Sequence, residues 1–440
     1  MKTLPPDART CSGAERGQYP NKLGRPECTF VGVDTVDKPK MRPIEATPVT
    51  DRGRQLVMLR DPQGLSEQVL TVPQPVFYLI TQFDGNHTLN EIQANYTRRF
   101  GQLIFSDKIK EIVQALDNAL MLDSDRFRQH REALEQEFRG LDVRPCSHGG
   151  KSYPGEAAEL ARLVDSFFEP PKGPGQPAPG ASERPVKGLM APHIDFLRGG
   201  PCFAHAYKEL AESPAPDTVV ILGIAHTFTQ NHFVLTRKSF ETPFGVCPSD
   251  TELTNGLLAR GGIHLLADEL AHRTEHSVEF QVVFLQHLFP AAKIVSVLCG
   301  AFRDADGNAC APAQAPGVPE FIDALRETVQ AAGKRVCLLA SVDFSHLGGR
   351  FGERIQITPQ FLGRVERDDL ETLNQAASLD ADAFYASATA DNDRRHIDAT
   401  PAVYTLLKAL DLEEAKVLKY DQSVEAQTQS VVTFASMVFR

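Results

Sequence analysis

The chain has 440 residues, of which 42% are hydrophobic and 23% are charged. This is the balance of an ordinary globular protein, so a mainly disordered or fibrous chain is excluded, and the length predicts two or three domains. The 57 acidic residues outnumber the 46 basic ones and give a formal net charge of −11, which leaves no bulk positive field for non-specific binding of nucleic acid.

The sequence also bears on membrane association and on the cellular compartment of the protein. No run of about 18 apolar residues predicts a membrane span, and the first 20 residues lack the apolar core of a secretory signal. The eight cysteines include no CxxC pair. In a long chain without a signal, scattered cysteines indicate reduced thiols and hence a cytoplasmic protein. Neither nucleic acid nor a membrane is expected as a partner.

The N-terminal third is expected to hold a tail and a small domain. Residues 1–48 are polar, contain several Pro and Gly and show no sustained periodicity, which predicts a flexible tail. Residues 49–140 predict two short strands joined by a turn at residues 61–64 and then helices. Thr88, with Glu91 three positions later, is the pattern of a capping box at the start of a helix. Two strands and about three helices indicate an α+β domain of winged-helix proportions.

Residues 148–440 alternate apolar runs with helical segments. The runs VKGLMAP, TVVILGIA, KIVSVLCGA and RVCLLASVDF are short and continuous, as in strands that are buried on both faces. They predict an α/β domain with a mainly parallel sheet flanked by helices. The closing segment AKVLKYDQSVEAQTQSVVTFASMVFR alternates and predicts antiparallel edge strands. The Pro/Gly-rich stretch at residues 169–185 predicts a surface excursion or a hinge.

Three histidines follow three of these predicted strands. His193 comes after VKGLMAP, His226 after TVVILGIA, and His346 after RVCLLASVDFS, with Asp343 three residues earlier. Residues just past the carboxyl ends of parallel strands line the ligand crevice of such a sheet, so we expect these side chains to converge. Imidazoles with a carboxylate suit a transition metal and leave positions open for substrate. The alternative is that these residues form buried hydrogen bonds at the strand ends, with Asp343 as an N-cap.

Two further groups of polar residues precede predicted helices. In RTEHSVEFQ, His276 and Glu279 lie one helical turn apart and Glu275 stands before them. They fit the support of a metal-bound imidazole or general acid–base work, against the alternative of a solvated helix start. His396 and Asp398 stand just before a helix that a Thr-Pro pair is expected to start. If that helix start faces the same crevice, His396 is a candidate ligand.

The segments APHIDFLRGG, ILGIAHT, TEHSVEFQVVFLQHL, ASVDFSHLGG and DATPAVYTLLKAL together resemble the Memo family in their order and spacing. The resemblance spans residues 148–440. Bacterial members are known as AmmeMemoRadiSam system protein B and usually occur with a radical-SAM protein and an AMMECR1-like protein, so the resemblance implies these two as partners. It also implies the fold of the class III extradiol dioxygenases, which use a non-haem iron.

The same resemblance implies roles for individual residues. His193 and His226 correspond to the family's metal-binding histidines. Asp343 and His346 match its DFSH-type pocket residues, and Glu275-His276 match its EHS motif.

The chain departs from the family at the third ligand, which is a Cys in a CG pair before the last helix. Ile397-Asp398 stand there instead, beside His396. Either His396 or Asp398 takes the place of the Cys, or the metal site is weakened or lost, because exchanging a thiolate for another ligand changes both affinity and potential. The expected cofactor is a divalent transition metal, iron first, with copper or zinc as alternatives.

A second resemblance covers about residues 52–125. The segment FDGNHTLNEI resembles the PqqD-like domains that bind the leader peptides of ribosomally made peptides. Such a domain captures a peptide as an added strand at an open sheet edge, so the resemblance implies a PqqD-like winged-helix domain at residues 49–140 and a peptide or protein partner. The alternative is a winged helix that only docks or dimerises.

Together these patterns favour a metal-dependent oxidoreductase of the dioxygenase-like kind, coupled to a peptide-recognition domain and working with a radical-SAM partner. The expected metal ligands are His193, His226 and either His396 or Asp398. The expected catalytic residues are Glu275, His276, Asp343 and His346. A non-catalytic scaffold that presents a peptide or partner protein is the alternative, favoured by the missing Cys. Metal-assisted hydrolysis, in which a bound metal activates water, is a third hypothesis.

Overall fold

The computed structural model describes residues 37–440. Most of the predicted tail, residues 1–48, lies outside the described residues, and its last part enters the antiparallel sheet of the small domain, in which β2 lies between β1 and β3. The elements of this domain are β1 (Glu45–Asp51), β2 (Arg54–Arg60), β3 (Val69–Pro73), α1 (Gln74–Ile80), α2 (Leu89–Phe100) and α3 (Ser106–Asn118). The sequence predicts β2 and β3 but not β1, because EATPVTD is polar and mostly exposed.

The predicted capping box forms at the start of α2. The Thr88 hydroxyl oxygen accepts from the Glu91 backbone N–H at 3.3 Å, and the Glu91 carboxylate accepts from the Thr88 N–H at 2.8 Å. Apolar side chains of β2 and of all three helices, among them Val57, Ile92 and Val113, pack into one core. The small domain therefore has a hydrophobic core of its own, while its PqqD-like identity stays a prediction.

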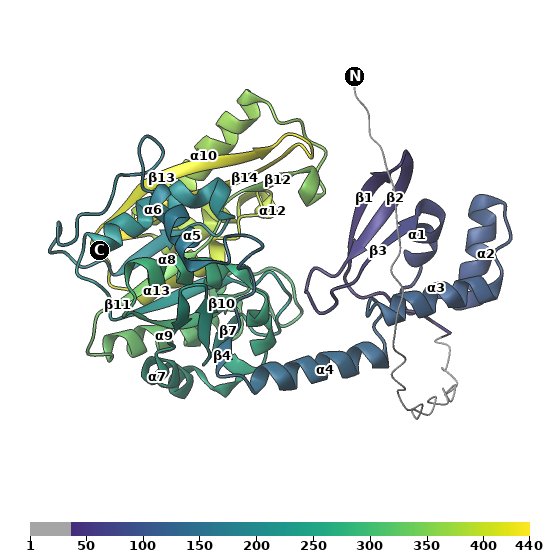
Figure 1. The fold of residues 1–440 in the computed structure, drawn as a ribbon, viewed down its shortest axis with the longest axis horizontal. Helices are drawn as coiled ribbons and strands as arrows, with labels where there is room; N and C mark the ends of the chain where they lie inside the picture. Colours follow the sequence, from purple (N-terminus) through teal and green to yellow (C-terminus); the bar gives the residue numbers. More distant parts are fainter. Residues whose placement is uncertain (1–36) are drawn as a thin grey trace, which may run out of the picture.

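Helix α4 (Asp125–Arg139) connects the small domain to the larger one, as Figure 1 shows. The buried Lys238 of the larger domain fixes the C-terminal end of this helix. Its Nζ donates to the carbonyl of Arg139 in the last turn at 3.5 Å and to that of Leu141 just after the helix at 2.7 Å, and it lies 4.9 Å from the centre of the Phe138 ring. A cation at this position satisfies carbonyls that the helix leaves without partners.

The larger domain is built on an eight-stranded sheet in the order β12-β14-β5-β11-β6-β10-β7, with β13 paired to β14. The four predicted runs form β5, β6, β10 and β11, which are parallel, and the closing segment adds antiparallel strands. All seven residues of β6 are buried, which explains its continuous apolar run. The strands of this domain are β4 (Val143–Arg144), β5 (Gly188–Ala191), β6 (Thr218–Ile224), β7 (Phe233–Thr236), β8 (Ser239–Thr242), β9 (Gly245–Cys247), β10 (Lys293–Cys299), β11 (Val336–Ser341), β12 (His346–Gly348), β13 (Ala415–Glu425) and β14 (Ser430–Phe439).

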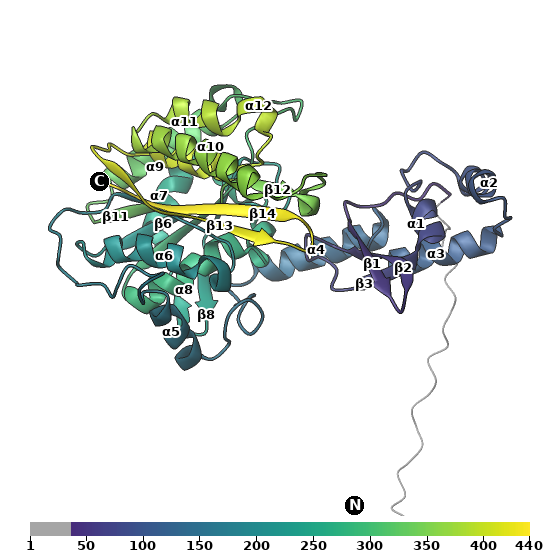
Figure 2. The same cartoon turned by 90° about the horizontal axis from the view of Figure 1, so that it is seen from above.

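Helices cover both faces of this sheet, as predicted (Figure 2). One core lies between the sheet and α5, α6 and α8, and the other lies between the sheet and α7, α9, α10, α11 and α13. The helices are α5 (Ala157–Ser166), α6 (Phe196–Ala211), α7 (Thr251–Gly261), α8 (His276–Leu288), α9 (Val318–Gln330), α10 (Pro359–Ala377), α11 (Ala381–Ala388), α12 (Ala390–Asp393) and α13 (Thr400–Ala409). Short 3-10 helices span Ile263–Leu266, Glu269–Arg273, Pro312–Gln314 and Gly349–Phe351.

Two further predictions for the larger domain concern the Pro/Gly-rich stretch and the helix before it. The Pro/Gly-rich stretch at residues 169–185 contains neither helix nor strand. Helix α5 is shorter than the amphipathic run SYPGEAAELARLVDSFF, because Pro154 and Gly155 interrupt its start. Within residues 37–440, none of the helices is both long and apolar enough for a membrane crossing.

Candidate metal centre

The centre lies at the carboxyl end of the parallel sheet. His193 follows β5 by two residues, His226 follows β6 by two, and Asp343 follows β11 by two. Strand β11 pairs with both β5 and β6, so the three strands deliver these side chains to neighbouring points of one edge. This is the crevice position that the sequence predicts.

His276 reaches the same edge from the first turn of α8. The hydroxyl of Ser277 donates to the carbonyl of Ile224 at 3.0 Å and accepts from the Ile224 N–H at 3.1 Å. Gly223 allows this close approach, because a Cβ there would lie 2.6 Å from the Ser277 Oγ. The start of α8 is therefore docked directly on the end of β6, and His276 lies beside His226.

The three imidazoles form one cluster. One ring nitrogen from each of His193, His226 and His276 lies within 4.8 Å of the others. The ring centres are 5.0 Å apart for His193 and His226, 5.2 Å for His193 and His276, and 4.6 Å for His226 and His276. Three converging imidazoles are a donor set that suits iron, copper, nickel or zinc.

Hydrogen bonds orient each ring through its Nδ1. The Nδ1 of His193 lies 3.0 Å from the carbonyl oxygen of Ser341, which can only accept, so this nitrogen carries the proton. The Nδ1 atoms of His226 and His276 lie 3.0 and 3.1 Å from the carboxylate of Glu275. Nε2 is therefore the nitrogen that each neutral ring leaves available to a metal, the arrangement that carboxylate and carbonyl partners give metal-binding histidines.

Asp398 adds a carboxylate to the cluster. Its Oδ1 accepts from the Asp343 N–H at 2.8 Å, and its buried Oδ2 lies 3.1 Å from His193 Nε2, with no other donor bound to it among the described residues. A buried carboxylate oxygen needs a cationic partner, which here is either protonated His193 or a metal that takes the place of the Nε2 proton. The three rings and this oxygen therefore fit a divalent transition metal.

Asp343 supports the backbone of the centre. Its Oδ1 accepts from the backbone N–H groups of His193 and Ile194 at 3.1 and 3.2 Å, and its Oδ2 lies 3.8 Å from His193 Nε2. These two bonds fix the turn that follows β5 and hence the position of the His193 ring.

His346 and His396 lie at the edge of the centre. His346 Nδ1 lies 2.9 Å from the Phe344 carbonyl and 3.1 Å from the His396 carbonyl, which leaves its Nε2 4.0 Å from Asp398 Oδ2. The His396 backbone is left-handed, with φ of 50°, and its side chain is exposed. The structure thus brings His276 and Asp398 to the predicted pair of His193 and His226, whereas His396 contributes a carbonyl that orients His346.

Charge at the centre shifts the pKa values of its groups in opposite directions. Burial disfavours the charged form of His193, but Asp398 and Asp343 outweigh it and raise its pKa to about 10. For His276 burial prevails over Glu275 and lowers the pKa to about 4. The Glu275 carboxyl is also buried, but its hydrogen-bonded histidines hold its pKa well below the usual value. The carboxylates therefore favour a positive charge at His193, which a bound metal would supply in place of the proton.

The fully buried Arg144 holds the segment that carries Glu275 and His276. Its Nη2 donates to the carbonyl of Glu275 at 2.9 Å, its Nε donates to the carbonyl of His272 at 3.0 Å, and its guanidinium pairs with the equally buried Glu279. The sequence predicts a supporting role for Glu279, but nothing in the run VRPCSHGG singles out Arg144. Its partners are more than 120 residues away in the chain.

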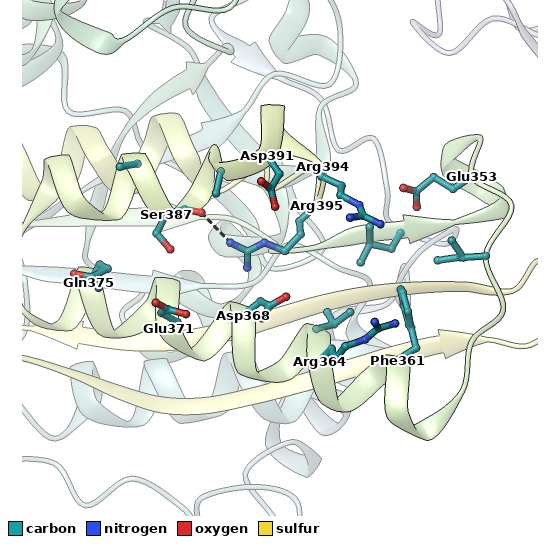
Figure 3. Close-up of a pocket in the computed structure, with 15 residues that line it drawn as sticks. Glu353, Phe361, Arg364, Asp368, Glu371, Gln375, Ser387, Asp391, Arg394 and Arg395 are labelled. Atoms are coloured by element: carbon teal, nitrogen blue, oxygen red, sulfur yellow. Dashed lines mark hydrogen bonds between the residues drawn. The ribbon is translucent and has the colours of Figure 1, made fainter.

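Arg395 anchors the segment that carries Asp398. Its guanidinium pairs with the buried Asp369 at 2.8 Å and donates to Thr372 and to the carbonyl of Ser387, both at 2.9 Å. Figure 3 shows this side chain reaching toward Ser387 across the groove between α10 and α11. The carbonyl of Arg395 then accepts from the His346 N–H at 2.8 Å, so one residue fixes both the loop and His346.

A family model and several known proteins are similar to this chain, mainly over the larger domain. A family model described as Memo-like protein matches residues 144–438. The chain is 28% identical over 405 residues to a MEMO1 family protein of Aquifex aeolicus, an alignment that covers 91% of this chain and 100% of the relative. It is 28% identical over 355 residues to one of Thermus thermophilus (80% and 98%) and 31% identical over 310 residues to one of Methanothermobacter thermautotrophicus (67% and 99%). The Aquifex alignment extends well outside residues 144–438, so that protein is similar to this chain in the N-terminal part as well.

Proposed function

This chain belongs to the Memo family, and from that premise we propose that its larger domain is a metal-dependent oxidoreductase of the dioxygenase-like kind. The metal would be a divalent transition ion, iron first, with copper or zinc as alternatives. The observation that carries this proposal is the convergence of His193, His226 and His276 within 4.8 Å, with the Nδ1 of every ring already engaged and Asp398 Oδ2 3.1 Å from His193 Nε2.

The proposed ligands are His193, His226 and His276, with Asp398 in the place of the family Cys. This set differs from the sequence-based expectation in using His276 as a ligand and in leaving His396 out. When bound, the metal would supply Lewis acidity and, for iron or copper, one-electron chemistry. Glu275 would orient His226 and His276. His346, whose Nε2 points toward Asp398, would hold or release a proton at the edge of the centre.

Metal analysis of the purified protein tests this proposal. Protein from iron-supplemented cells should retain about one metal ion per chain, and the His193→Ala/His226→Ala double variant should retain none. The matched control is His232→Ala/His264→Ala, which removes a half-buried and an exposed histidine that are not members of the cluster and should leave the metal content unchanged. Wild-type protein without metal, or equal occupancy in the first double variant, would overturn the proposal.

A scaffold function is the second candidate, and the small domain supports it. β3 is an edge strand of its sheet, and an open edge can accept a peptide as an added strand. In this candidate a PqqD-like small domain holds a peptide while the larger domain contacts a cytoplasmic radical-SAM or AMMECR1-like partner. Peptide or partner capture by the full chain with and without a chelator separates the two candidates. The scaffold is favoured if capture survives chelation and the metal-loaded protein shows no catalytic activity.

A further inference from the structure

A cavity of about 560 Å³ opens beside the proposed metal centre. It lies between the end of β6, the loop that follows β10 and the segment that precedes α13. Asp398 and Ala225, the neighbour of His226, line it. A cavity of this size is within the range of small-molecule sites in proteins, and its position places a ligand next to the metal.

The floor of the cavity is apolar. It is formed by side chains that are buried in the domain, namely Ile224, Cys299, Phe302, Ile397 and Pro401. The hydroxyl groups on its walls are directed to backbone partners. Tyr385 donates to the carbonyl of Cys310 at 2.7 Å, and Thr400 donates to the carbonyl of Ile397 at 3.0 Å. The walls therefore offer a ligand mainly dispersion and burial of apolar surface.

The charges around the cavity select against anions. Asp393 and Asp398 line it, and no Lys or Arg does. A divalent metal in the centre would be offset by the carboxylates of Glu275 and Asp398, so an anionic ligand would face Asp393 without a cationic side chain to pair with, at a cost that grows as the site excludes water. The groove in Figure 3 differs, because Arg364, Arg394 and Arg395 line it together with its carboxylates and offer an anion cationic partners.

Two polar side chains on the rim have no hydrogen-bond partner within residues 37–440. They are His396, whose ring is exposed, and Asn392. Both can donate and accept, so they can recognise a hydroxyl or carbonyl group at the open end of a ligand. This gives His396, which lies outside the three-histidine cluster, a place in ligand recognition.

We propose that this cavity is the substrate site of the metal centre and that it takes a neutral, largely apolar small molecule with one polar group facing His396 and Asn392. The inference rests on the proposed function, since it identifies the substrate class of the same centre. It adds that the ligand is uncharged and that its apolar body, rather than an anionic group, provides the binding energy.

Binding of two probes that share one aromatic ring system to the full-length protein tests the inference. Isothermal titration with 2-naphthol, which is neutral, and with 2-naphthoate, its anionic counterpart, should show at least tenfold tighter binding of 2-naphthol. Ala309→Trp and Ala311→Trp fill the cavity from its wall and should each weaken 2-naphthol binding by tenfold or more. Ala305→Trp is the matched control, because it lies on the same loop but lines the neighbouring cavity, and it should leave binding unchanged.

The titrations are run on metal-loaded and on chelated protein with intact circular dichroism spectra. Equal or tighter binding of 2-naphthoate, no binding of 2-naphthol, or equal losses in Ala305→Trp and Ala311→Trp would overturn the inference. Selective 2-naphthol binding in a protein that holds no metal would support the cavity while the proposed function fails. If the protein retains metal but does not bind 2-naphthol, the proposed function stands and the inference about the cavity fails.

Discussion

Glu275 connects two of the three imidazoles of the centre. Its carboxylate contacts the Nδ1 atoms of His226 and His276 and also accepts from the N–H groups of His226 and Ser277, both at 3.0 Å. A glutamine keeps the size of the side chain but replaces one acceptor oxygen by a donor. One of the two Nδ1–H groups then loses its acceptor, and the orientation of that ring is no longer fixed.

We therefore expect Glu275→Gln to weaken metal binding by about 10- to 100-fold, as loss of a partner of a metal-binding histidine does. Competition titration against a chelator measures the affinity. Glu252→Gln, which changes an exposed carboxylate on α7, is the control and should bind metal as the wild type does. An affinity in Glu275→Gln equal to that of the control would contradict the role given to Glu275.

His272 makes the stability of the fold depend on pH. Its ring is buried, its Nε2 lies 3.0 Å from the Val234 carbonyl, and burial lowers its pKa to about 4 from an ordinary value of 6.5. Because the unfolded chain binds this proton more readily, the contribution of the neutral ring to stability is complete above about pH 6.5 and is lost as the pH falls toward 4.

Between pH 7.5 and 5, this residue alone should cost the fold about 2 kcal/mol. Urea unfolding of the wild type and of His272→Gln at both pH values measures the effect, since the glutamine does not titrate and should remove that part of the pH dependence. His264→Gln, which replaces an exposed histidine, should keep the wild-type dependence. Equal pH dependence in His272→Gln and the wild type would show that His272 is not buried as a neutral ring.

At the scale of elements, the junction of β6 with α8 decides where His276 lies. A Cβ at Gly223 would meet Ser277 Oγ at 2.6 Å and the Val278 side chain at 2.9 Å. Gly223→Ala should therefore displace the first turn of α8, destabilise the domain by about 1–3 kcal/mol, and lower the metal affinity. Chemical denaturation and chelator competition measure the two effects.

Gly363→Ala provides the control for that experiment. Gly363 lies within α10, where a Cβ would meet nothing within 4 Å, so alanine should be neutral or should stabilise the helix by up to about 1 kcal/mol. If Gly223→Ala is as stable as Gly363→Ala and binds metal as well as it does, the close contact between β6 and α8 is not what places His276.

The sequence was sufficient for features that are local or repeated along the chain. Continuous apolar runs predict the four parallel strands because burial on both faces leaves no polar side, and the parallel order alone brings His193 and His226 to one edge. The sequence predicts His276 as a catalytic or supporting residue of the centre. That its ring joins the two histidines as a candidate ligand could not be predicted in the same way, because it depends on a contact between Gly223 and Ser277, which are far apart in the sequence. The backbone at His396 is left-handed, which a sequence pattern does not reveal for a non-glycine residue. The sequence therefore could not decide whether His396 is a metal ligand.

At the scale of the whole molecule, the small domain contacts the segment that leads to His276. The buried Asp61 organises the β2–β3 loop: its carboxylate pairs with Arg42 at 3.1 Å and accepts from the N–H groups of Leu65 and Ser66 at 3.1 and 3.0 Å. At the tip of this loop the carbonyl of Gly64 accepts from Arg273 Nη1 at 3.2 Å. The ordered loop of one domain thus reaches a residue three positions before His276 in the other.

Arg144 lies where the chain enters the larger domain after α4, and it joins that entry to the metal centre. Arg144→Met keeps the length and apolar stem of the side chain but leaves the Glu279 carboxylate buried without its cation, and it removes the donor to the Glu275 carbonyl. We expect a loss of about 3–5 kcal/mol of stability and, at temperatures where the variant is folded, weaker metal binding. Denaturant unfolding and chelator competition measure both.

Arg335→Met, which breaks an exposed pair with Asp217, is the control. It should cost less than about 1 kcal/mol of stability and leave the metal affinity unchanged. A destabilised Arg144→Met protein that still binds metal as the wild type does would separate the anchoring of the fold from the placement of Glu275 and His276, and would restrict Arg144 to the first.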